Sequence, residues 1–181
     1  MEAIGILESN SIAKGIEAMD MVLKAADTRL LYARTVCPGK YTILFYGDVA
    51  AVQAAADAGG LSLAHHLVDS IVIPRIHSQV IQAIGLSTEA SQGNAVGIME
   101  FYSVAGAVYG ADAAVKAAEV TLLDIRLGMG IGGKSFAVLT GDVAAVQEAV
   151  ECGMAEGEKR GLAVESVVIP GPREEVFGQL M

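Results

Sequence analysis

The chain carries one pattern twice. Three strings occur in both halves in the same order: AIGILE and AVGIME, GDVAAVQ twice, and IVIP and VVIP, beginning at residues 3 and 95, 47 and 141, and 71 and 167. The offset between the copies therefore grows from 92 to 94 to 96 residues. This self-similarity indicates a duplicated domain, with two short insertions in connections of the second copy.

The repeat also predicts where the domains end. At 181 residues the chain is short enough for one domain, but the duplication divides it into units of about 90 residues, each able to bury a modest core. We predict a first domain at 1–89, a linker at 90–94 and a second domain at 95–181. The polar stretch STEASQGN, at 87–94, has the composition of a surface linker.

Composition limits the possible partners. The hydrophobic fraction of 53% comes mostly from Ala and Val, with no Trp, which favours close packing through small side chains. No apolar run approaches the roughly 20 residues of a membrane span. The net charge of −9 repels phosphate backbones and anionic lipid, and the 12 basic residues are scattered. We therefore expect neither nucleic acid nor membrane as a partner.

The chain start and the cysteines favour a cytosolic protein. The first repeat begins at residue 3, which leaves no room for a secretory signal ahead of it. The two cysteines, Cys37 and Cys152, fall at non-equivalent places in the two copies. A structural disulfide is therefore not expected.

Each copy predicts the order βαββαβ, an α/β fold of the ferredoxin-like α+β type. A short strand is followed by a cap at Ser11 or Ser103 and by a helix. Two strands then flank a loop, and a helix capped by Asp48 or Asp142 precedes the last strand. The first helix is expected to bury one apolar face, made of Ile12, Ile16, Met19, Leu23 and Ala26, and of Val104, Val108, Ala111, Val115 and Ala118 in the second copy.

These strings resemble bacterial microcompartment shell domains. The resemblance rests on AIGILE, on MVLKAA at 21–26, on the GDVAAV turn and on IPRIH at 73–77, and it covers nearly all of both copies in the unpermuted order. In that family, tandem-domain chains form trimers whose six domains make a hexagonal tile with a central opening. The resemblance implies a homotrimer in a cytoplasmic microcompartment shell, with other shell proteins at its edges.

A narrower resemblance concerns the two loops. Cys37-Pro38-Gly39-Lys40 in the first copy, and Gly130, Ile131, Gly132, Gly133 and Lys134 in the second, are similar to the pore loops of the iron-sulfur-bearing shell trimers of propanediol-utilisation compartments. An iron-sulfur cluster normally takes four thiolates, and one chain offers one suitable thiol, so no site within one chain is possible. On a threefold axis, three copies of Cys37 converge on one [4Fe-4S] cluster per trimer. The backbone around Pro38, Gly39 and Lys40 is a candidate for second-layer contacts.

The second loop also fits the dinucleotide fingerprint GxGxxG over residues 128–133. That fingerprint needs a strand before it and a helix after it, whereas the run after Lys134 is strand-like. Nucleotide binding is therefore disfavoured, and the glycines suit a tight pore-lining loop instead.

Three basic residues are candidates for tile-edge contacts. Lys24 and Lys116 occupy equivalent positions near helix ends, where a lysine is favourable to the helix dipole. The resemblance implies that such lysines meet a neighbouring tile, with Arg75 as their companion. In the second copy Gly171 stands where that arginine stood, so the edge is expected to differ there.

Three functions remain open from the sequence. The leading one is a noncatalytic shell tile that carries the Cys37-ligated cluster for electron transfer, with a redox enzyme as partner, or for cluster transport across the shell. The second is a tile with a passive or gated metabolite pore and no cluster. The third, a redox enzyme with its own substrate, is disfavoured because no acid-base or nucleophile set recurs outside the loop.

Overall fold

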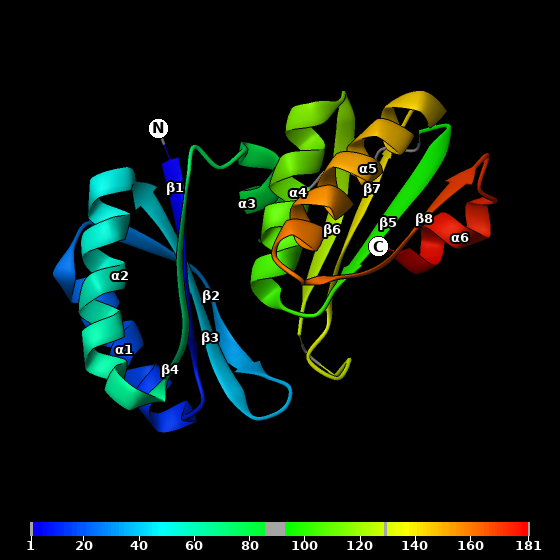
Figure 1. Cartoon of the computed structure of the whole chain (residues 1–181). Coiled ribbons are helices and arrows are strands. Elements are labelled where there is room, and N and C mark those ends of the chain that lie inside the picture. The colour runs from blue at the N-terminus through cyan, green and yellow to red at the C-terminus, as the bar shows by residue number, and fades with distance from the viewer. Residues whose placement is uncertain (1, 86–92, 129, 181) are drawn as a thin grey trace. The chain divides into compact units, whose positions relative to one another are not determined.

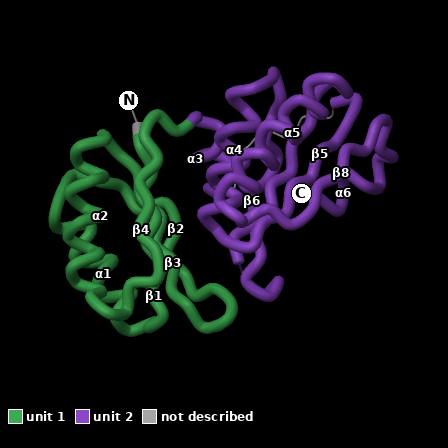
Figure 2. The backbone as a smooth tube through the Cα atoms, viewed as in Figure 1, with its two compact units in different colours: residues 1–76 green, residues 77–181 purple. Residues whose placement is uncertain are grey.

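The computed structural model describes residues 2–85, 93–128 and 130–180. They form two compact units, residues 1–76 and 77–181 (Figure 2). The first unit contains β1 (Glu2–Ser9), α1 (Ile12–Ala25), β2 (Thr28–Val36), β3 (Lys40–Asp48), α2 (Val49–Leu63), η1 (Ala64–His66) and β4 (Leu67–Pro74). The second contains α3 (Ser78–Ile84), β5 (Ala95–Phe101), α4 (Val104–Ala117), β6 (Val120–Leu127), β7 (Ser135–Gly141), α5 (Val143–Lys159), β8 (Ala163–Pro170) and α6 (Glu174–Leu180).

The predicted βαββαβ order is confirmed in both copies. Each unit has one antiparallel sheet, in the order β2-β3-β1-β4 or β6-β7-β5-β8, with the first strand of the repeat at a central position. The two long helices of each unit cover one face of its sheet (Figure 1). Among the described residues, no helix is long and apolar enough to cross a membrane.

The helix starts follow the predicted caps in part. Ser11 Oγ accepts a hydrogen bond from Lys14 N at 3.4 Å, and Ser103 Oγ accepts one from Gly106 N at 3.0 Å. Asp48 and Asp142 also stand at N-cap positions, but their side chains make no cap hydrogen bond. All four predicted residues thus stand where a helix begins, but among these four only the two serines make a side-chain capping bond.

The predicted buried face is confirmed on α4 and wrong on α1. Val104, Val108 and Ala111 are buried, whereas Ile12 and Ile16 are exposed. The buried side of α1 instead consists of small or β-branched residues, Gly15, Ala18 and Val22. Because α1 lies close to the sheet and to α2, its core side has no room for the larger side chains of the apolar stripe.

Glycine sets the close approach of the two helices that cover each sheet. A Cβ at Gly153 of α5 would lie 2.7 Å from the carbonyl oxygen of Gly110 on α4. A Cβ at Gly110 would lie 2.2 Å from Cζ of the fully buried Phe101. The prediction of tight packing through small residues is thus confirmed, with the aromatic ring filling space that the glycines leave.

The two units divide earlier than the predicted domain limit. The division falls between Ile76 and His77, and helix α3, which the sequence analysis places in the first domain, packs against β6 and α4 of the second unit. Polar contacts of His77 and Gln79 hold α3 against the second unit, and the repeat pattern does not reveal them. Most of the predicted linker at 90–94 lies outside the described residues.

The two insertions of the second copy differ in kind. The first lies in the connection between β6 and β7, as predicted. The second lies in a helix, since α5 has 17 residues and its counterpart α2 has 15. The longer helix α5 does not disturb the pairing of the next strand, β8, with β5.

We predict that Gly110→Ala lowers the free energy of unfolding by about 1–3 kcal/mol, because the added methyl group overlaps the Phe101 ring. Gly178→Ala on α6 is the matched control, since nothing lies within 4 Å of a Cβ there, and it should leave stability unchanged or raise it slightly. Urea unfolding of both variants measures the difference. Equal stability of the two would contradict the packing described here.

Candidate functional site: the two hairpin loops

The hairpin loop of the first unit presents Cys37. Strands β2 and β3 pair as far as Val36 and Lys40, which leaves a loop of three residues. Gly39 N donates a hydrogen bond to Val36 O at 3.0 Å, and Gly39 has φ of 88°, a conformation that suits glycine. Cys37 is a free, partly exposed thiol, and the Cys37–Pro38 peptide bond is cis. The loop that carries Cys37 therefore lies beyond the last paired residues of the two strands (Figure 1).

An ion pair stands at the base of this loop. Lys40 Nζ lies 2.9 Å from Oε2 of Glu8, the residue near the end of the central strand β1. The Glu8 side chain is 9% exposed and that of Lys40 is 33% exposed. The pair links the first residue after the loop to the middle of the sheet.

The loop of the second unit is longer and lacks cysteine. Its described glycines, Gly128, Gly130, Gly132 and Gly133, all have φ between 60° and 83°. The loop leads directly into β7, so the helix that the dinucleotide fingerprint requires is absent from this place. Lys134 Nζ lies 3.2 Å from Glu100 Oε2, which repeats the ion pair of the first unit.

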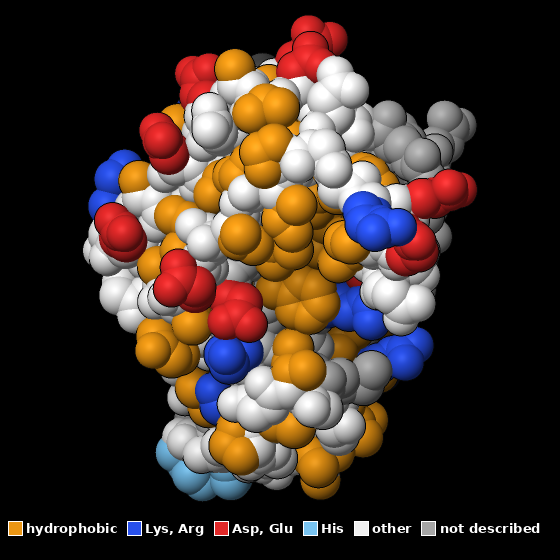
Figure 3. Space-filling view, turned by 90° about the vertical axis from the view of Figure 1, so that its right-hand side faces the viewer, with side chains coloured by type: hydrophobic (Ala, Val, Ile, Leu, Met, Phe, Trp, Pro, Cys, Tyr) orange, Lys and Arg blue, Asp and Glu red, His pale blue; other side chains and the backbone are white. Residues whose placement is uncertain are grey.

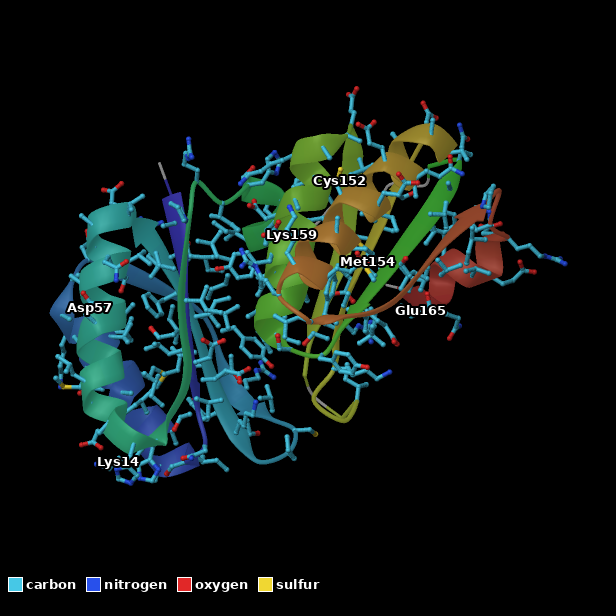
Figure 4. The ribbon with its side chains drawn as sticks, viewed as in Figure 1. Lys14, Asp57, Cys152, Met154, Lys159 and Glu165 are labelled. Atoms are coloured by element: carbon cyan, nitrogen blue, oxygen red, sulfur yellow. The ribbon has the colours of Figure 1, made fainter. Side chains whose placement is uncertain are left out.

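On its hairpin loop, one chain offers one of the three thiolates that the expected cluster site needs. Cys37 lies on the loop of the first unit, whereas Cys152 is exposed on α5 of the second (Figure 4). Cys152 is therefore not part of the core. Within the described residues, no group of three His, Cys, Asp or Glu side chains is placed to hold a metal ion. A cluster would accordingly need the same loop from several chains.

The two candidate edge lysines make equivalent ion pairs within their own helices. Lys24 Nζ lies 2.5 Å from Asp20 Oδ2, and Lys116 Nζ lies 2.5 Å from Asp112 Oδ2. The side chain of Lys24 is 69% exposed and that of Lys116 is 42% exposed. The sequence carries a signal for these pairs, since Asp20 and Asp112 each stand four residues before the lysine on the same helix. A role for either lysine in tile contacts stays a prediction.

Arg75, the third candidate, has a left-handed backbone. Its φ is 56°, and Gly171, the residue at the equivalent place in the second copy, has φ of 55°. The turn after the last strand is thus the same in both copies, but only the second copy fills it with the residue that the conformation favours. Arg75 is exposed, so the fold of its own unit gains little from the side chain.

We predict that Arg75→Gly leaves the free energy of unfolding unchanged or raises it by up to about 1 kcal/mol, because the left-handed conformation costs a non-glycine residue about 1–2 kcal/mol. Arg29→Gly, at an exposed position of β2, serves as control and should destabilise. Urea unfolding compares them. A clear loss of stability in Arg75→Gly would show that the side chain supports the fold itself.

Comparisons with known proteins agree on one family. The model of the BMC domain matches residues 3–76 and 95–172. The bacterial microcompartment shell protein PduT of Citrobacter freundii is 45% identical over 180 residues, which are 99% of this chain and 98% of the relative. The bacterial microcompartment shell protein EutM of Escherichia coli (strain K12) is 38% identical over 95 residues, which are 50% of this chain and 98% of the relative.

A solved structure agrees over both units. The crystal structure of a microcompartment protein from Desulfitobacterium hafniense DCB has a TM-score of 0.95 and 49% sequence identity, and the match covers 97% of this chain and 98% of that one. The likeness therefore includes both copies of the repeat and is not confined to one domain.

Proposed function

The chain belongs to the BMC domain family and is a bacterial microcompartment shell protein, and we propose that three copies form one tile whose central opening binds a [4Fe-4S] cluster through Cys37 of each chain. The observation that carries the proposal is a single thiol, held on a short hairpin loop, in a chain with two shell domains. Three such chains supply six domains and three thiolates.

A face of the first unit supports the assembly of several copies. In the second unit, α3 covers the edge strand β6 and contacts α4. The side chain of Gln79 donates to Val120 O at 3.2 Å and accepts from Leu122 N at 2.8 Å. His77 N donates to Asp112 Oδ1 at 2.8 Å. In the first unit the equivalent edge strand is β2, where the exposed Leu30 corresponds to Leu122. The edge of the first unit at β2 therefore resembles a contact surface whose partner lies outside this unit.

The apolar stripe on α1 shows the same difference. Ile12, Ile16 and Leu23 are 42%, 49% and 40% exposed, whereas their counterparts on α4 are 1%, 0% and 9% exposed, in the order Val104, Val108 and Val115. Three aligned apolar side chains beside a free sheet edge are typical of an interface. We assign a second copy of this chain as the occupant, because unit 2 already binds a segment at the equivalent place.

We predict that Ile16→Glu dissociates the trimer, since a carboxylate in this apolar contact has no partner. Met21→Glu is the control: Met21 is 42% exposed on the same helix, but at 100° per residue it lies on the other side from the stripe. Light scattering after size exclusion measures both masses. Trimers of equal stability in the two variants would remove the α1 stripe from the interface.

The chemistry of the loop suits iron and sulfide. Thiolates are the usual ligands of such clusters, and three of them leave one iron of a [4Fe-4S] cluster open to water or another ligand. When bound, the cluster supplies a one-electron carrier. The chain itself contributes the Cys37 thiol, on a loop whose turn is closed by the hydrogen bond from Gly39 N to Val36 O. A cluster in a shell opening suits electron transfer to a redox enzyme, or transport of the cluster across the wall.

We predict that Cys37→Ala loses iron and sulfide while the trimer stays intact, whereas Cys152→Ala keeps both. The wild type, purified or reconstituted without oxygen, should hold about four irons per trimer. Iron and sulfide analysis with EPR of the reduced protein measures this. Iron retained by Cys37→Ala would refute the ligand assignment, and an iron-free wild type would leave a tile with a metabolite pore.

The outer surface is compatible with contacts between tiles. Figure 3 shows one side of the molecule, where hydrophobic side chains gather in the middle and charged ones lie around them. Each exposed ion pair is worth only about 0–1 kcal/mol, but a tile that meets several neighbours multiplies weak contacts. We propose other shell proteins as edge partners, with Lys24, Arg75 and Lys116 among the contacts.

A further inference from the structure

We propose that Glu8 is a positioning residue for the cysteine loop: its carboxylate holds the Lys40 ammonium on the sheet and cancels its charge beside Cys37. The inference deepens the proposed cluster site. Its evidence is the geometry of the loop base, and its test uses the thiol without iron.

The register of the sheet brings the pair together. On β1, Glu8 is paired with Thr42 of β3, and Lys40 lies two residues before Thr42, so the three side chains share one face of the sheet. Lys40 is also paired with Val36, the residue directly before Cys37. The ammonium therefore belongs to the base of the same three-residue loop as the thiol.

The surroundings of Glu8 make the pair important. Its neighbour Thr42 is fully buried, and within the described residues Thr42 Oγ1 has no hydrogen-bond partner. A carboxylate in such a poorly hydrated place is unfavourable without a cation. The ion pair thus offsets the loss of hydration of the Glu8 carboxylate, and in return Glu8 fixes where the ammonium lies.

The second unit provides a natural comparison. Its pair, Glu100 and Lys134, has the same position in the repeat, but both side chains are more exposed, at 39% and 44%. Phe136 replaces Thr42, and the loop beside it carries glycines and no cysteine. The tighter and less hydrated pair therefore accompanies the loop that bears the thiol.

Charge at the opening is the expected consequence. Three free lysine ammonium groups around a central opening would attract anions to the three thiols and disfavour cations there. With Glu8 paired to each Lys40, the two charges at each loop base cancel. Access of charged reactants to Cys37 should then depend on Glu8 and be independent of Glu100.

The test is the alkylation of Cys37 in the iron-free full chain, in a Cys152→Ser background where it is the remaining cysteine. Anionic iodoacetate and neutral iodoacetamide both react with the thiolate. The rate with iodoacetate divided by the rate with iodoacetamide is therefore independent of the fraction of the thiol that is ionised. Glu8→Gln should raise this ratio severalfold, because the Lys40 ammonium at the base of the Cys37 loop is then uncompensated. Glu100→Gln should leave the ratio unchanged.

Two further variants keep the proposal falsifiable if Glu8→Gln does not fold. Lys40→Gln should lower the ratio, because Glu8 is then uncompensated, and the double variant Glu8→Gln with Lys40→Gln should return it to the wild-type value. A ratio that does not respond to any of these changes would overturn the role of Glu8. A wild type that does not bind iron would refute the proposed cluster site, but it would not change the alkylation result.

Discussion

The antiparallel pairing of β1 with β3, and of β5 with β7 in the second unit, fixes which side chains face the core and where the hairpin loop begins. In the first unit it runs without a break from Glu2 and Asp48 to Ser9 and Tyr41. A slip of one residue would turn Phe45 out of the core and move Lys40 to the other face, away from Glu8. The core, the ion pair and the direction of the cysteine loop therefore depend on one register.

Duplication explains how two units of the same strand order come to differ in their loops and outer faces. The second unit keeps the ladder and the ion pair but changes the loop, where glycine in left-handed conformations replaces the cysteine turn. The same positions that are buried on α4 are exposed on α1. Divergence is thus concentrated in loops and outer faces, which contribute little to the core and are free to serve assembly.

Much of the fold was predictable, because strands and hairpins follow from local patterns that occur twice. The error on α1 has a physical cause: its core side is made of Gly15, Ala18 and Val22, which carry a weak hydropathic signal, while the strong apolar stripe lies outside. The packing of α3 was missed because it depends on Gln79 reaching the distant strand β6. The loop that carries Cys37 was predicted from the strands on either side of it, whereas the contact between Glu8 and Lys40 required the strand register.

A single thiol on the hairpin loop of each chain makes the proposed chemistry a property of the assembly. One loop has too few thiolates for a cluster, so the proposed site would be complete only where three chains meet. In the proposed trimer, the same symmetry would multiply the charge of each loop threefold at the opening. A lysine left unpaired would thus affect the site three times over, which is a physical reason for an acid at the end of the central strand.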